Sequence, residues 1–168
     1  MAETQCMHEP FAALAATGPQ HESLARFAGT WRAEVKFWMD PAQPPQVSRG
    51  TMTNMLVLGG RFLQQEYRDD AGMFEGRGFW GYNTIDQRYE GVWIDSMATF
   101  FQIEHGQHDP AADTYTMVGT MTDPTSRRPM RKRSVIVYRG PNEHTLEMFF
   151  EGQAGRENKA MEIRYTRA

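Results

Sequence analysis

The chain has almost no cysteine, since Cys6 is the only one among its 168 residues. A single thiol cannot close a disulfide within the chain, so the sequence does not indicate a disulfide-stapled secreted scaffold. Cys6 also precedes every expected strand, which argues against a catalytic thiol. The first residues lack a basic segment followed by an apolar run, and no stretch of about 18 apolar residues exists. We therefore expect a cytoplasmic protein with no membrane partner.

The chain also lacks a strong excess of either charge, with 18 Lys and Arg against 21 Asp and Glu, a net charge of −3. This balance argues against a protein devoted to nucleic acid. One basic cluster, residues 127–133, interrupts the pattern, and its alternation favours a solvated strand face. The sequence contains no phosphate-cradling glycine motif, no Gly-x-Ser-x-Gly and no His-Glu-x-x-His. We expect no nucleic-acid partner, and no motif names a reaction.

Helical periodicity is scarce and is confined to one short stretch. Leu24 and Phe27 lie one turn apart within residues 21–28, which predicts a short helix that Gly29 ends. We expect residues 1–20 to form a flexible N-terminal lead-in and residues 21–168 to form a single β-barrel domain.

A period of two begins at Gly29-Thr30-Trp31 and continues to the C-terminus. Turn-forming clusters such as Gly59-Gly60 and Asp69-Asp70-Ala71-Gly72 divide this region into about ten strands. Ten antiparallel neighbours would leave exposed edges unless the sheet closed on itself. The prediction is an all-β fold, a closed antiparallel up-and-down barrel of about ten strands with a short N-terminal helix. The Gly-x-Trp at the entrance to its first strand resembles that of lipocalins, so the barrel is expected to be calycin-like. A β-sandwich is the alternative.

A ten-stranded barrel has a wider bore than an eight-stranded one, so a ligand cavity is expected. The alternation predicts an aromatic, methionine-rich interior with a few polar groups, suited to a small hydrophobic ligand. The expected ligand-binding residues are Phe37, Glu66, Trp80, Tyr82, Trp93, Asp95, His105 and Met148. Within this set, His105 is assigned to the lumen together with Phe101 and Ile103, which share its strand face.

The sequence is compatible with three functions. The first is binding of a small hydrophobic or aromatic molecule in the lumen. The second is a small enzyme (an isomerase, cyclase or lyase) that uses Glu66, Asp95 or His105 as general acid or base. The third is a haem-binding barrel with His105 or His144 as the iron ligand.

No metal and no cofactor are expected. His105 and His108 would point to opposite faces of a strand, and no third ligand accompanies them. An exposed apolar strand face could make a homodimer.

Several segments resemble the bacterial family called domain of unknown function 1579. They are residues 24–31, 58–63, 78–83, 93–97 and 161–167, in that order along residues 20–168. Two departures are Asn83, where the family usually has Asp, and Trp80, which replaces a smaller apolar residue. The resemblance implies a calycin-like barrel and no assigned activity. A lumenal Trp80 would make the interior narrower or more aromatic at this point.

Overall fold

The structure is a computed structural model that describes residues 14–152 and 155–168. Within these residues the chain forms one short helix, α3 (Pro19–Ala25), and ten strands. Cys6 and most of the lead-in expected over residues 1–20 lie outside the described residues. The strands are β1 (Gly29–Phe37), β2 (Gln46–Val57), β3 (Phe62–Asp69), β4 (Glu75–Asn83), β5 (Arg88–Asp95), β6 (Gln102–Asp109), β7 (Thr114–Thr122), β8 (Pro129–Tyr138), β9 (Glu143–Glu151) and β10 (Glu157–Arg167).

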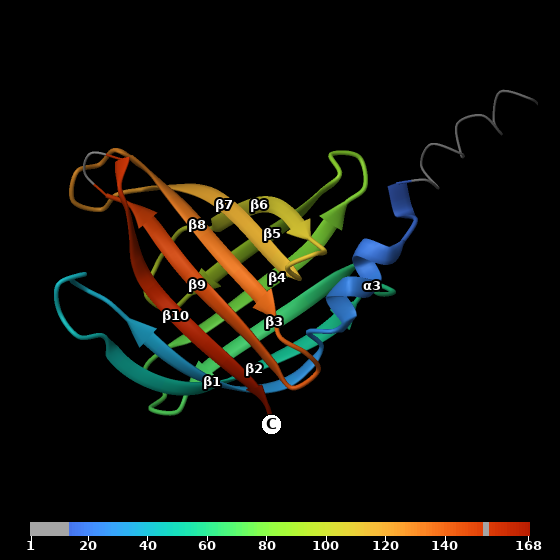
Figure 1. The fold of residues 1–168 in the computed structure, drawn as a ribbon, viewed down its shortest axis with the longest axis horizontal. Helices are drawn as coiled ribbons and strands as arrows, with labels where there is room; N and C mark the ends of the chain where they lie inside the picture. The colour runs from blue at the N-terminus through green and yellow to red at the C-terminus, as the bar shows by residue number, and fades with distance from the viewer. Residues whose placement is uncertain (1–13, 153–154) are drawn as a thin grey trace, which may run out of the picture.

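The ten strands close into one barrel (Figure 1). Each strand pairs antiparallel with its neighbours in the sequence, and β1 joins the two ends of the sheet. Trp31 on β1 pairs in register with Met52 on β2 and with Arg167 on β10. Closure gives every strand two hydrogen-bonded neighbours and removes the exposed edges of an open sheet. The predicted all-β barrel is confirmed, and the β-sandwich alternative is wrong.

Alternation along each strand separates an inner face from an outer face. On β1, Trp31, Ala33 and Val35 are buried inside the barrel, while Thr30 and Arg32 are exposed. The buried apolar side chains form two clusters, one around Phe27 and Trp80 and the other around Trp31 and Ile163. The core is therefore the filled part of the lumen.

Helix α3 closes one end of the barrel (Figure 1). It begins two residues before the predicted boundary at residue 21, because Pro19 occupies its first turn, where its missing N–H costs no hydrogen bond. Leu24 and, just beyond the helix, Phe27 are fully buried in the core. In the described residues, no helix is long and apolar enough to cross a membrane.

The Gly29-Thr30-Trp31 motif fixes how the helix enters the barrel. The indole Nε1 of Trp31 donates a hydrogen bond of 2.8 Å to the carbonyl oxygen of Phe27, and Asn54 Nδ2 donates to the same oxygen at 2.9 Å. This buried carbonyl lies just beyond the end of α3, and the two side chains satisfy it. The motif thus joins the end of α3 to β1 and β2.

Candidate binding site in the barrel lumen

The two ends of the barrel differ in how completely their side chains fill it. Beneath α3, inward-facing side chains such as Leu63 and Tyr115 are fully buried. At the opposite end, the inward-facing side chains keep partial exposure to solvent. We call this region the open half and define it by Phe37, Phe74, Trp93, Asp95, Gln102, Glu104, Lys132, Met148, Phe150 and Met161, of which Lys132 alone is buried.

A row of three residues crosses the open half on adjacent strands. Glu104 on β6 pairs in register with Gly119 on β7, which pairs with Lys132 on β8. The Lys132 residue is only 5% exposed, and its Nζ forms an ion pair of 3.0 Å with Glu104 Oε1. A Cβ atom on Gly119 would lie 2.3 Å from the Ile103 carbonyl oxygen and 3.2 Å from Glu104 Cγ. The missing side chain at Gly119 leaves the space across which the two charged groups meet.

Hydrogen bonds extend this ion pair along the wall of the barrel. Ser134 Oγ donates to Glu104 Oε1 at 2.8 Å, and Lys132 Nζ donates to Gln102 Oε1 at 3.0 Å. The amide Nε2 of Gln102 then donates to Asp95 Oδ2 at 3.1 Å. The result is a continuous polar network that runs along the inner wall of the barrel from β5 to β8.

Trp93 lies against the glycines of β4. A Cβ atom on Gly76 would stand 2.2 Å from the Trp93 ring, and one on Gly78 would stand 2.8 Å from it. Trp93 Nε1 donates to Asp95 Oδ2 at 3.2 Å, which holds the indole in this position. Glycines weaken a strand unless another group approaches closely, and here the approaching group is the Trp93 ring.

Six of the eight predicted ligand-binding residues face the lumen, although their role in binding stays a prediction. Phe37, Trp93, Asp95 and Met148 belong to the open half. Trp80 and Tyr82 lie at the end closed by α3: Trp80 is buried against Phe27, and Tyr82 contacts His21 edge-on. The lumenal Trp80 is therefore packed into the plug at the closed end.

The prediction that Glu66 and His105 line the lumen is wrong. Glu66 is exposed on the outer face of β3, where it accepts a hydrogen bond from Gln64 Nε2, because its neighbour Tyr67 takes the buried face. His105 is exposed on β6, and so are Ile103 on the same strand and Phe101 just before it, the two residues predicted to share its lumenal face. Asp95 is therefore the only lumenal member of the three acid–base candidates.

His144 is lumenal but enclosed by aromatic rings. Its imidazole stacks on Tyr165 at a centroid distance of 4.4 Å and meets Trp31 and Phe27 edge-on. Burial, aided by the nearby positive charge of Arg167, lowers the pKa of His144 to about 3. With His105 on the outer surface, neither histidine of the haem hypothesis faces the open half.

The sequence interpretation missed Lys132, Glu104, Gln102 and Ser134. Lys132 stands in the basic cluster 127–133, whose alternation predicts a solvated strand face. Arg131 and Arg133 do point outward and pair with Glu157, but Lys132 shares the buried face with Ser134 and Ile136. The sequence does contain a signal that Lys132 faces inward. Ile136, an apolar residue four positions later, lies on the same face of the strand as Lys132. In the described parts of the chain, no group of three or more His, Cys, Asp or Glu side chains is placed to hold a metal ion.

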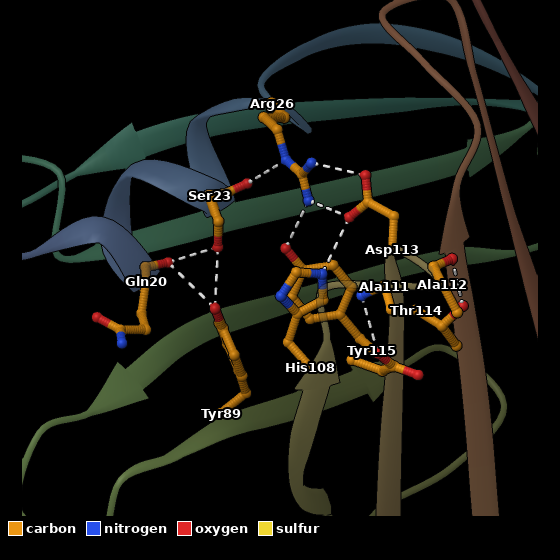
Figure 2. Close-up of polar contacts among 11 residues, drawn as sticks. Gln20, Ser23, Arg26, Tyr89, His108, Ala111, Ala112, Asp113, Thr114 and Tyr115 are labelled. Carbon is orange, nitrogen blue, oxygen red and sulfur yellow. Dashed lines mark hydrogen bonds and ion pairs between the residues drawn. The ribbon is translucent and has the colours of Figure 1, made fainter.

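A second polar cluster fastens α3 over the closed end (Figure 2). The Arg26 guanidinium donates two hydrogen bonds to the Asp113 carboxylate, at 2.7 and 2.8 Å, and one to Tyr115 Oη at 2.8 Å. His108 Nε2 lies 2.9 Å from Asp113 Oδ1, and Ser23 Oγ lies 2.9 Å from Tyr89 Oη. The Arg26 hydrogen bonds hold the pKa of the Asp113 carboxyl below its usual value. These contacts keep the helix in place as a plug.

Comparisons with known proteins locate the chain in a family and a fold. No curated protein matches it. The crystal structure of Rv2717c from M. tuberculosis is similar with a TM-score of 0.62 at 14% identity, covering 91% of this chain and 99% of that one. The S-type phycobiliprotein lyase CPES from Guillardia theta is similar with a TM-score of 0.53 at 14% identity, covering 88% and 91%. The model of a family described as "Protein of unknown function (DUF1579)" matches residues 16–167, and the chain belongs to this family.

Proposed function

We propose that the protein binds a small hydrophobic or aromatic molecule in the open half of its barrel. The observation that carries this proposal is the contrast between the two ends. One end is filled by its own side chains and covered by α3, while apolar side chains facing inward at the other end remain partly exposed. Apolar surface that is enclosed yet still reached by solvent gains free energy when a ligand covers it.

The lining supports an apolar ligand with a defined orientation. Trp93, Phe74 and Phe150 offer aromatic surface, and Met148 and Met161 add flexible apolar side chains that adapt to a ligand's shape. The network from Asp95 to Ser134 supplies the few polar groups that such sites use to orient what they bind. The similarity to the phycobiliprotein lyase is a similarity of fold, and the ligand class proposed here rests on the lining.

A fluorescence titration tests the proposal. Nile red is a neutral apolar dye whose emission rises when it enters an apolar site. We expect saturable binding to the native protein and a loss of affinity of tenfold or more in Met148→Trp, where the larger side chain fills the lumen. Thr145→Trp is the matched control, because Thr145 lies on the same strand but faces outward.

The absence of saturable binding by the native protein would overturn the proposal. Equal affinity of Met148→Trp and Thr145→Trp would place the dye elsewhere and would also contradict it. Native mass spectrometry of the freshly purified protein would identify any molecule retained in the barrel. The cytoplasmic location and the homodimer also stay predictions, and light scattering on a size-exclusion column measures the oligomeric state.

A further inference from the structure

We propose that Lys132 and Glu104 form the polar anchor of the ligand site, and that they select a neutral head group that both donates and accepts hydrogen bonds, such as a primary amide or a lactam. This inference rests on the proposed function, since it specifies the ligand of the same site. Burial of the Lys132 ammonium costs free energy. A buried ammonium loses its hydration, and an apolar residue in its place is often no less stable.

The ion pair retains unused hydrogen-bonding capacity. The Lys132 ammonium has three N–H donors, and the structure gives it two partners, Gln102 Oε1 and Glu104 Oε1, among the described residues. Glu104 Oε1 also accepts from Ser134, whereas none of the described residues forms a hydrogen bond to Glu104 Oε2. A free donor and a free acceptor therefore stand beside each other on the wall of the open half. A group with one N–H and one carbonyl oxygen complements this pair.

The formal charge of the network disfavours an anionic ligand. Asp95 and Glu104 contribute two carboxylates against the single ammonium of Lys132. The nearest other cations on β8, Arg131 and Arg133, point outward and pair with Glu157. A carboxylate ligand would add a third negative charge in a partly buried place, where like charges repel strongly. A neutral head group avoids this repulsion.

The neighbours of the pair favour a flat molecule. Lys132 is in register with Phe150 on β9, and Gln102 is in register with Trp93 on β5. Trp93 is held against β4 by its contacts with Gly76 and Gly78. One aromatic side chain thus lies beside Lys132 and another beside Gln102. Aromatic faces pack well against planar amides and rings. The inferred ligand is a planar, largely apolar molecule with a neutral amide-like group.

Three naphthalene probes of the same ring system test the inference: 2-naphthamide, 2-naphthoate and 2-methylnaphthalene. Their dissociation constants are measured by quenching of tryptophan fluorescence. We expect the amide to bind about tenfold more tightly than the hydrocarbon, because it forms hydrogen bonds to the Lys132 ammonium and the Glu104 carboxylate. We expect 2-naphthoate to bind more weakly than the amide because of the carboxylate repulsion.

Two variants separate ligand selection from a structural role. Lys132→Met removes the donor to the amide carbonyl oxygen, so the preference for 2-naphthamide over 2-methylnaphthalene should shrink. Glu104→Gln keeps the shape and removes one negative charge, so its affinity for 2-naphthoate should rise about tenfold. If the ion pair had only a structural role, neither variant would change the order in which the protein prefers the three probes. Arg133→Met, an outward-facing basic residue on the same strand, is the control and should leave all three constants unchanged.

Two outcomes would overturn the inference while the proposed function stands. One is equal affinity of the native protein for all three probes. The other is an unchanged affinity of Glu104→Gln for 2-naphthoate, a readout that remains if Lys132→Met fails to fold. If neither Nile red nor any naphthalene binds, the proposed function itself fails and the inference fails with it.

Discussion

Arg26 and Asp113 form a two-point ion pair that joins helix α3 to the β6–β7 turn, with N–O distances of 2.7 and 2.8 Å (Figure 2). The Arg26 guanidinium also lies over the Tyr138 ring, 4.3 Å from its centroid. The pair fixes the plug from one side, and the packing of Phe27 beneath it fixes the plug from below. The closed end of the barrel therefore depends on a charged contact at its rim.

Replacement of Arg26 by Met should loosen the plug. The variant loses the four hydrogen bonds that the Arg26 side chain donates to Ser23, Asp113 and Tyr115 in a partly exposed place, so we expect the free energy of unfolding to fall by about 1–2 kcal/mol. Faster hydrogen exchange at the α3 amides should accompany this loss. Urea denaturation and hydrogen exchange measure both effects. Arg32→Met is the control, because the Arg32–Asp70 pair is exposed on the outer surface. An equally large effect of the two substitutions would contradict the role assigned to Arg26.

Replacement of Gly119 by Ala should destabilise the barrel. The added Cβ would lie 2.3 Å from the Ile103 carbonyl oxygen, which strand pairing holds in place, so the strands must shift. We expect a loss of about 1–3 kcal/mol, as for other overpacked interiors. Gly91→Ala is a matched control, since a Cβ at Gly91 meets its nearest atom at 3.7 Å, an ordinary contact. Thermal unfolding of the two variants checks the prediction, and equal midpoints would contradict it.

His144 should make the stability of the protein depend on pH. Its folded-state pKa is about 3, below the ordinary value of 6.5, so the unfolded chain binds a proton that the folded protein does not. The stabilisation is fully present above pH 6.5 and is lost as the pH falls from 6.5 towards 3. The slope approaches about 1.4 kcal/mol per pH unit within this window.

Urea denaturation at several pH values between 7.5 and 4.5 measures this slope. His144→Gln should flatten it, while His105→Gln should not, because His105 is exposed. A slope that is the same in all three proteins would show that burial of His144 is not its cause.

Lys132 and Glu104 should show strong energetic coupling. Lys132→Met leaves the partly buried Glu104 carboxylate without its cation, and we expect a loss of about 3–5 kcal/mol. The double variant Lys132→Met/Glu104→Leu removes both charges and should be less destabilised than the sum of the two single variants. Chemical denaturation of the four proteins gives the coupling energy. Additive losses would contradict the ion pair seen across Gly119.

The sequence by itself determined the fold. The period of two after Gly29, the regular turns and the cost of open edges together predict a closed barrel, and the short spacing of Leu24 and Phe27 predicts the plug. It also determined the lumenal face of β1, β4 and β5, because the large apolar and aromatic residues of these strands lie mainly on one face. Trp31, Trp80 and Trp93 all face inward for this reason.

Only the tertiary structure decided which face of β6 is inside. Alternation defines two faces of a strand but does not say which one is buried, and on β6 the polar Gln102 and Glu104 alternate with the apolar Ile103. Pairing with β7 settles the choice, because Gly106 is in register with Met117, whose side chain is buried in the core. With Gly106 inside, Glu104 is inside and His105 is outside. The ion pair of Lys132 and Glu104 could not be predicted for the same reason, because the two residues are far apart in the sequence and meet only when β6, β7 and β8 pair in this register.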